Sequence, residues 1–196
     1  MHQKAYAVRA IFVEIPEIQL QKLNISWMPK PTSPDSNTSF TVVDSGSVMD
    51  QICSSPQVRL TEFPVVHVNA GEREIIDNRR PVKYPATFDT DGTPTEYATT
   101  GVGRLIEVNL KSVTNNIVQF SYHIEDVGDP VWIPRKLGNS SRKIELPSFD
   151  SRSEDCSGIT LQLNSWVISV GQIPESKDGT KWNLIRGIRV QESASP

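Results

Sequence analysis

The sequence lacks any long apolar run. No stretch of it approaches the roughly 18 residues that a membrane-spanning helix needs. The opening residues, MHQKAYAVRAIFVEIPE, are not expected to form a signal peptide, because Lys4 and Arg9 interrupt the only apolar stretch there. We therefore predict neither a membrane helix nor a cleaved leader in these 196 residues.

Positive charge is neither abundant nor clustered. The chain has 20 lysines and arginines against 23 aspartates and glutamates, which gives a formal net charge of −3. The notable adjacent basic pairs are Arg79-Arg80 and Arg142-Lys143, and solvated surface charge explains both. Nucleic-acid binding depends on a basic patch or stripe, so we predict no nucleic-acid partner.

Cysteine and histidine are also scarce. Cys53 and Cys156 show no metal-type spacing, and two unrelated buried thiols are favoured over the alternative of a disulfide. His67 and His123 fall on the polar sides of expected strands, and His2 is near the terminus, so we interpret them as surface imidazoles. No spacing brings a cysteine and a histidine together. We predict no catalytic residue, no metal ligand, no cofactor and no enzymatic activity.

Several short motifs imitate binding sites. The GVG at Gly101–Gly103 lacks the third glycine and the following helix of a nucleotide fingerprint, so turn glycines suffice. The segments Asp89–Gly92 (DTDG) and Asp150–Asp155 (DSRSED) resemble parts of a calcium loop but lack its bidentate glutamate, and ordinary turns are preferred. The tryptophans sit among apolar strand positions, which favours core or subunit packing over a ligand-stacking platform. They are Trp27, Trp132, Trp166 and Trp182.

Extended segments dominate what the sequence does contain. Tyr6–Ile15 is rich in β-branched and aromatic residues on both faces, which predicts a central strand. Further strands are expected at 63–70, 75–76, 131–133, 143–146, 159–170 and 182–191, with a hairpin turn at Asn69–Glu72. The segment after Pro16 could form a short helix or a loop, and Asp44-Ser45 could cap a further helix that runs to about Ser54.

The stretch 105–125 (LIEVNLKSVTNNIVQFSYHIE) predicts a hairpin whose register depends on its turn. A two-residue turn at Asn115-Asn116 would oppose apolar and polar side chains. A three-residue loop from Thr114, with Asn116 left-handed, instead gives one apolar and one polar face, so we predict this register, with Glu107 opposite His123. The expected apolar pairs are Leu110 with Phe120, Val108 with Tyr122, and Ile106 with Ile124.

We therefore predict a mostly β fold, an antiparallel sheet or sandwich of seven or more strands with one or two short helices. It is expected to form a single domain over residues 1–196, with loops at 28–43 and 80–103 and a tail at 192–196. The 80–103 loop is long enough to be functional or mobile.

In the order of its segments, the chain resembles the C-terminal secretin domain of bacterial type II and III secretion system proteins, in a compact variant. The similarity lies in 7–27, whose opening strand leads to Trp27, and in 48–75, where Pro64, Asn69, Gly71 and Ile75 match. It continues in the proline-bearing 81–85, in 102–125, which resembles a "VG-x-x-L-x-V-x-P" strand and its return strand, and in 157–171. Asn24, Glu74 and Leu110 stand where the family usually has glycine, alanine and proline.

This resemblance implies a homo-oligomer or an envelope protein partner, because secretins form rings whose C-terminal domains make an outer-membrane channel. It also implies a location in the bacterial periplasm or outer membrane. The segment 28–44, where the family carries a membrane hairpin, is short and holds Pro29, Pro31 and Pro34. We therefore expect this chain alone neither to insert into a membrane nor to form a pore.

The sequence thus predicts a non-enzymatic structural or assembly domain of a bacterial envelope or secretion-related complex. The alternative is a soluble ligand- or protein-binding β-sandwich in which the loop 80–103 does the binding.

Overall fold

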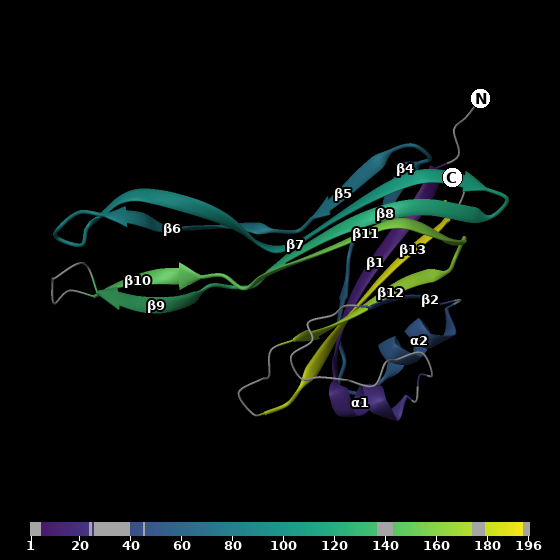
Figure 1. Ribbon diagram of the computed structural model, residues 1–196, viewed down its shortest axis with the longest axis horizontal. Coiled ribbons are helices and arrows are strands. Elements are labelled where there is room, and N and C mark those ends of the chain that lie inside the picture. Colours follow the sequence, from purple (N-terminus) through teal and green to yellow (C-terminus); the bar gives the residue numbers. More distant parts are fainter. Residues whose placement is uncertain are drawn as a thin grey trace. The chain divides into compact units, whose positions relative to one another are not determined.

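The computed structural model describes residues 5–23, 25, 40–44, 46–136, 143–173 and 179–193 (Figure 1). Thirteen strands and two helices lie in these residues, and the recorded strand pairs are antiparallel. The predicted mostly β, antiparallel fold with two short helices is confirmed. Trp27, Asn24, Arg142 and the part of the expected first loop at 28–39 lie outside the described residues.

The elements follow in the order β1 Ala5–Pro16, α1 Glu17–Lys22, β2 Phe40–Asp44, α2 Ser47–Ser54, β3 Arg59–Glu62, β4 Val66–Asn69, β5 Arg73–Asp77, β6 Arg80–Phe88, β7 Pro94–Thr114, β8 Ile117–Val127, β9 Val131–Lys136, β10 Lys143–Ser148, β11 Ser151–Gln162, β12 Trp166–Ile173 and β13 Trp182–Glu192. Neither helix of the described chain has the length and apolar character to cross a membrane.

The chain forms two compact units. The first unit comprises Met1–Glu74, Asn109–Phe120 and Gly158–Pro196, and the second comprises Ile75–Val108 and Ser121–Ser157. The long strands β7, β8 and β11 each contribute residues to both units. The prediction of a single domain over residues 1–196 stays a prediction.

A six-stranded sheet with β1 at its centre organises the first unit. The strand order is β2-β12-β13-β1-β3, and β4 also pairs with β1. The pairing of β1 with β13 runs without interruption from Tyr6 opposite Glu192 to Pro16 opposite Trp182. Most side chains of β1 are buried on both faces, which confirms the central strand predicted from its apolar sequence.

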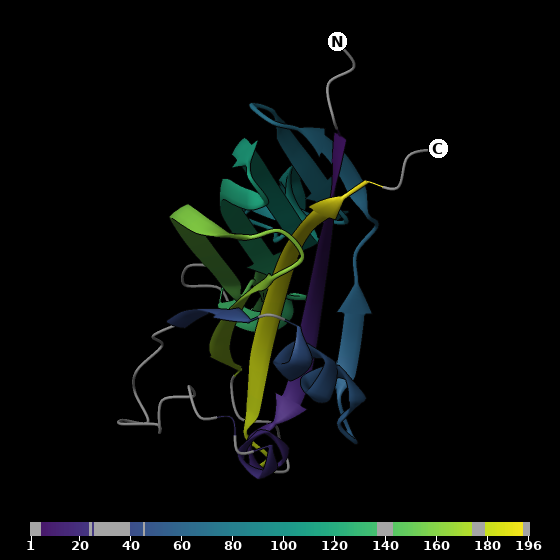
Figure 2. The same ribbon diagram turned by 90° about the vertical axis from the view of Figure 1, so that its right-hand side faces the viewer.

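Both helices add to a core on one face of this sheet (Figure 2). Gly187 lets α2 approach closely, because a Cβ there would lie 2.9 Å from Cε of Met49. The N-cap of α2 is Gly46, so the expected cap at Asp44-Ser45 is displaced by one or two residues. Asp44 still acts at this end, because its Oδ2 accepts a hydrogen bond from the Met49 amide at 3.1 Å. The buried core residues are Ile11, Val13, Ile15, Leu20, Met49, Ile52, Trp166, Ile168, Val170 and Ile185.

The turn of the β7–β8 hairpin differs from the prediction. Asn115 and Asn116 both have positive φ angles, of 51° and 62°, and Thr114 belongs to β7, so the connection has two residues and not three. Two consecutive left-handed residues suit the right-handed twist of the flanking strands, and asparagine tolerates this conformation.

The predicted apolar face of this hairpin is confirmed by its burial. The alternation of burial in β7 breaks where Ser112 and Val113 are both half-buried, the pattern of one extra residue in the strand. An extra residue in β7 shifts the pairing beyond it by one position, so the hairpin can have a two-residue turn and still place its apolar side chains on one face. The pairing of Glu107 with His123 stays a prediction. The buried residues are Ile106, Val108, Leu110, Val118, Phe120, Tyr122 and Ile124.

The expected loop 80–103 is instead a hairpin. β6 pairs with β7 from Arg80 opposite Val102 to Phe88 opposite Pro94, with an irregularity after Pro85. Proline suits such a strand because β6 lies at a sheet edge, where a missing N–H donor costs no ladder bond. The clustered prolines, glycines and threonines indicated a loop, but they are tolerated in an edge strand.

Other boundaries also differ. β4 and β5 do not pair with each other: β4 joins β1 and β5 joins β7, so the confirmed turn at Asn69–Glu72 carries the chain between two sheets. The expected strand 159–170 is broken between β11 and β12, where Asn164 has a φ of 70°. Asp150–Asp155 mostly lies in β11 and not in a turn, and residues 40–43 lie in β2 and not in a loop. β13 extends into the expected tail as far as Glu192.

Candidate functional site

Two hairpins of the second unit lie side by side, the β6–β7 hairpin and the β9–β10 hairpin (Figure 1). They line a cavity of about 470 Å³. Pro85, Phe88 and Gly92 line it from the first hairpin, and Trp132, Lys143, Ile144 and Glu145 from the second. Its volume falls within the roughly 300–1,000 Å³ typical of binding pockets.

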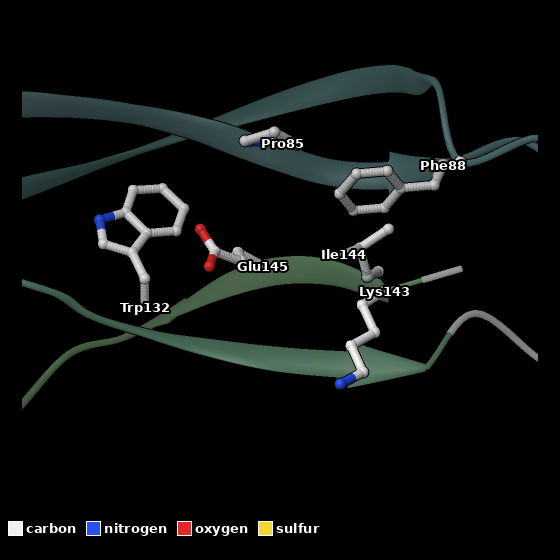
Figure 3. A pocket seen from close by; sticks show the side chains of 7 residues that line it. Pro85, Phe88, Trp132, Lys143, Ile144 and Glu145 are labelled. Carbon is white, nitrogen blue, oxygen red and sulfur yellow. The ribbon is translucent and has the colours of Figure 1, made fainter. Parts of the chain in front are cut away.

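Figure 3 shows how the side chains of this cavity lie. The indole of Trp132 and the ring of Phe88 stand at its two ends, and the carboxylate of Glu145 lies between them. The ammonium group of Lys143 points away from the other side chains. The cavity therefore offers two aromatic surfaces and one negative charge, a combination that suits apolar or cationic groups.

Large apolar side chains on these hairpins remain exposed. The exposed fraction is 67% for Val131, 43% for Trp132 and 55% for Tyr97, whose ring lies 4.8 Å from Nζ of Lys83. Trp132 is thus not part of the core, whereas Trp166 is buried, as predicted. For Trp132 the alternative of subunit packing stays open. Val131 and Trp132 follow one another on β9, so their side chains lie on opposite faces of the strand, and each face exposes a large apolar side chain.

The edges of these hairpins lack pairing partners within the described residues. β9 and β10 form a two-stranded sheet of their own, and β6 pairs with β7 alone. An isolated two-stranded hairpin is at best marginally stable in water. Unpaired strand edges are templates for pairing with a further chain. The hairpins therefore have both the side chains and the backbone groups of an association surface.

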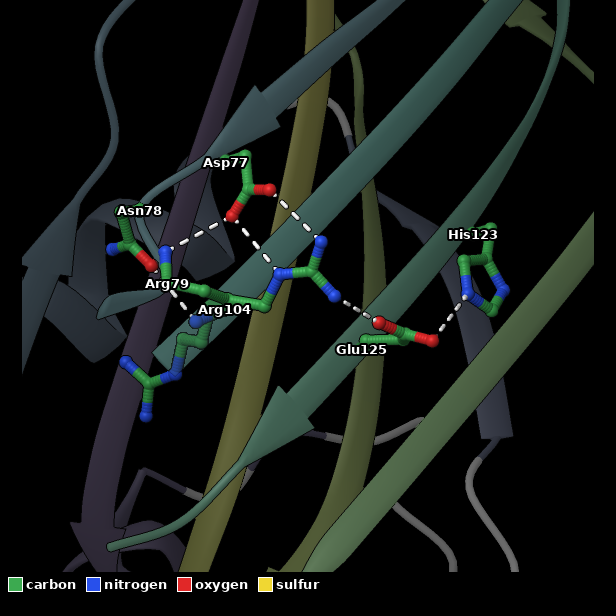
Figure 4. Close-up of polar contacts among 6 residues, drawn as sticks. All are labelled: Asp77, Asn78, Arg79, Arg104, His123 and Glu125. Atoms are coloured by element: carbon green, nitrogen blue, oxygen red, sulfur yellow. Dashed lines mark hydrogen bonds and ion pairs between the residues drawn. The ribbon is translucent and has the colours of Figure 1, made fainter. Parts of the chain in front are cut away.

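An ion-pair network lies at the base of the β6–β7 hairpin (Figure 4). Arg79 binds Asp77 with Nε at 3.0 Å from Oδ1 and Nη2 at 2.8 Å from Oδ2. Its Nη1 lies 2.6 Å from Oε2 of Glu125 on β8. The side-chain hydrogen bonds hold the pKa of Asp77 below its usual value and raise the pKa of Arg79. Arg79 therefore joins the end of β5 to β8 and is more than solvated surface charge.

A second set of contacts holds the segment between β5 and β6 against β7 and β8. The Arg104 amide donates to Oδ1 of Asn78 at 2.8 Å (Figure 4). Nε of Arg104 lies 3.2 Å from Oδ1 of Asp126. Arg80 also forms an ion pair with Asp129. Seven charged side chains take part in these two sets of contacts, which link the start of β6 to β7 and to the region around the end of β8.

The GVG motif in β7 leaves room for the backbone that connects β5 to β6. Gly101 and Gly103 lie within β7 and not in a turn, which corrects the sequence interpretation. Gly103 has a φ of +124°, and a Cβ there would lie 3.1 Å from both Cα of Arg79 and the carbonyl oxygen of Asn78. Glycine is needed here because the backbone between β5 and β6 crosses directly against it.

The residues considered for catalysis lie apart. Nδ1 of His67 is 2.9 Å from Oγ of Ser193 in the first unit, and Nδ1 of His123 is 2.8 Å from Oδ1 of Asp155 in the second. Cys53 and Cys156 are both free, as the favoured interpretation predicted, but each is half-buried and not buried. The partial burial of the Cys53 thiol raises its pKa.

The described part of the chain brings no three metal-binding side chains together. Asp89 shapes a turn: its Oδ1 accepts hydrogen bonds from the amides of Asp91 at 2.9 Å and Thr93 at 2.8 Å. The turn interpretation of the DTDG motif is confirmed.

Comparisons with known proteins give structural matches alone. No family model matches the sequence, and no curated protein does. The chain is similar to the InvG secretin domain β-barrel from the Salmonella SPI-1 injectisome, with 11% identity, a TM-score of 0.42 and coverage of all of this chain and 65% of that one.

It is also similar to the type II secretion system secretin GspD of E. coli, with 12% identity, a TM-score of 0.46 and coverage of 100% of this chain and 51% of that one. The Klebsiella pneumoniae type II secretion system outer membrane complex of PulD, PulS and the PulC HR domain matches with 11% identity and a TM-score of 0.49. The match covers 100% of this chain and 41% of that one. The chain therefore spans between 41% and 65% of these structures. They belong to the family that the sequence resembles.

Proposed function

We propose that this chain is a non-enzymatic assembly domain of a bacterial envelope or secretion-related complex, and that it associates with further copies of itself through the β6–β7 and β9–β10 hairpins. The observation that carries the proposal is the two-stranded β9–β10 sheet, which exposes Val131 and Trp132 and has no third strand within the described residues.

The energetics of the β9–β10 hairpin support association. Full burial of one large apolar side chain contributes roughly 1.5–3 kcal/mol, so covering either Val131 on one face of β9 or Trp132 on the other is favourable. A strand from another copy would also satisfy the edge N–H and C=O groups of β9 or β10. The same contact would give this sheet the third strand that independent stability requires.

The ion pairs at the base of the hairpins would hold the association surface in one orientation. Ordering two hairpins during assembly costs conformational entropy, and a preformed surface reduces that cost. Arg79 and Arg80 contribute by fixing the start of β6 to Asp77, Glu125 and Asp129.

The resemblance of the sequence to secretin domains supports the envelope location, in the bacterial periplasm or outer membrane. Part of the proposal is that the chain acts without a cofactor, a metal or a nucleic acid. It also holds that the chain does not insert into membranes by itself. Stoichiometric zinc in the purified protein, or a hydrolase activity that His67→Ala or His123→Ala abolishes, would contradict the non-enzymatic part.

The membrane part has its own test, in which the purified chain is mixed with liposomes and floated on a density gradient. The chain should stay at the bottom and release no entrapped dye. Flotation with dye release that persists at high salt would contradict this part of the proposal.

Light scattering on three versions of the chain tests the association itself. The wild type should form an oligomer of defined size, and Val131→Ser combined with Trp132→Ser should reduce that size. Ile18→Ser is the matched control, because Ile18 is 62% exposed on α1 in the first unit. A wild type that stays monomeric would refute the proposal and favour the soluble binding module, and a double variant of unchanged size would refute the assigned surface.

A further inference from the structure

A second cavity, of about 520 Å³, lies in the first unit. It is formed by the turn between β7 and β8, the turn between β11 and β12, and the end of β13 (Figure 1). The turns are joined by a hydrogen bond from the Leu163 amide to the carbonyl oxygen of Asn116 at 2.8 Å, and the Asn164 amide donates to the Val190 carbonyl oxygen at 2.9 Å. The cavity therefore has a backbone-bonded frame.

Carboxamides dominate the lining of this cavity. Asn115, Asn116, Gln162 and Asn164 line it together with the carboxylate of Glu192. All four side chains are exposed, and within the described part of the chain they make no hydrogen bond to other protein groups. Other asparagines differ: Nδ2 of Asn69 donates to Glu72 at 2.8 Å, and Oδ1 of Asn78 accepts from Arg104. The carboxamides at the cavity are thus available to a ligand.

The backbone adds a second observation. Asn115, Asn116 and Asn164 all have positive φ angles, where glycine is the conformationally easiest residue. At six other positive-φ positions of the described chain the residue is glycine, and Gln57 is the remaining exception. Asparagine adopts this conformation more readily than other non-glycine residues, so the three turn positions can carry a hydrogen-bonding side chain at little backbone cost.

We propose that this cavity binds a neutral carbohydrate. Each carboxamide offers both a donor and an acceptor, which matches the paired hydroxyl groups of a sugar. No lysine or arginine lines the cavity, so it is not built for phosphate or carboxylate. Ile117 and Leu163 supply apolar surface for the C–H face of a sugar ring. The volume falls in the range of small-ligand sites. This inference does not rest on the association surface of the second unit.

The test titrates the full chain with maltotriose and with triacetylchitotriose, followed by NMR signals of the backbone amides and the side-chain NH₂ groups. At least one of these sugars should bind saturably, with roughly millimolar affinity. The shifts should be confined to the two turns and the end of β13, and should include the NH₂ groups of Asn115, Asn116 and Asn164.

Glycine substitutions give a variant that keeps the turns. Asn115→Gly, Asn116→Gly and Asn164→Gly together preserve the left-handed backbone and remove three carboxamides, so the affinity should fall by about tenfold or more while the fold is retained. Gln57→Gly is the matched control, a positive-φ residue that does not line the cavity, and should bind as the wild type does.

The absence of saturable shifts with both sugars would overturn the proposal. Equal affinity in the triple glycine variant would overturn it as well. Shifts that map to other residues would show that the sugar binds elsewhere and would equally contradict the assigned site.

Discussion

Arg79 connects β5 to β8 through Glu125, with 2.6 Å between its Nη1 and Oε2 of the glutamate. The same guanidinium makes two hydrogen bonds to Asp77, so one side chain holds two carboxylates from separate strands. Because charge-assisted bidentate pairs are the stronger and more directional ones, this contact fixes where β6 begins.

The first prediction concerns acid. Hydrogen bonds from Arg79 lower the pKa of Asp77 in the folded chain. The carboxylate therefore stabilises the fold at pH values above the ordinary aspartate pKa of about 3.9, and this stabilisation is lost as the pH falls through the lowered pKa. Asp77→Asn should therefore reduce the free energy of unfolding at neutral pH, and the deficit should shrink on acidification. Urea unfolding of both proteins from neutral pH to about pH 3 measures this. A deficit independent of pH would contradict the assignment.

Gly103→Ala should destabilise the second unit by about 1–3 kcal/mol. A Cβ would meet the backbone of Asn78 and Arg79 at 3.1 Å, and the φ of +124° disfavours alanine. Gly128→Ala is the matched control, because its nearest contact would be 3.6 Å and its φ is not in the left-handed region, so its effect should stay within about 0.5 kcal/mol. Urea denaturation compares the two variants. Equal losses of stability would show that the close approach of Gly103 to the backbone of Asn78 and Arg79 does not require glycine.

Phe120→Ala should cost roughly 3–5 kcal/mol, because the ring is fully buried in the first unit. Ile117→Ala, three residues earlier on the same strand, should cost less than about 1 kcal/mol, since Ile117 is exposed. Chemical denaturation of both variants provides the measurement. A loss below about 1 kcal/mol for Phe120→Ala would show that this face does not belong to a packed core.

Cys53 should react slowly while the chain is folded. Burial raises the pKa of its thiol, and the thiolate is the reactive form. In a Cys156→Ser background, alkylation by iodoacetamide at mildly alkaline pH should be faster in urea-unfolded protein than in folded protein. Equal rates in the two states would contradict the partial burial of Cys53.

Local apolar patterning was enough to predict much of the fold. The continuous apolar run of β1 predicted a central strand, and alternation in 105–125 predicted the face on which Phe120 is buried. Both signals are local, because each depends on the side-chain period of a strand. Patterning did not predict pairing partners: β4 and β5 flank a correctly predicted turn but belong to different sheets.

The candidate site was largely missed, for physical reasons. Pro81 and Pro85 indicated a loop, because sequence alone does not show that β6 is an edge strand where proline is tolerated. The cavity joins Phe88 to Trp132, which are far apart in the sequence and share no spacing signal. The role of Gly103 depends on the backbone that crosses it, and only the tertiary structure shows that crossing.

Hydrogen exchange measured at several protein concentrations tests the central claim most directly. If copies associate through the hairpins, the amides of β9 and β10 (residues 131–136 and 143–148) should exchange more slowly as the concentration rises, because association stabilises them by mass action. The amides of β13, central in the first unit, should not change. Exchange in β9 and β10 that is independent of concentration, in a chain that oligomerises, would contradict the assigned surface.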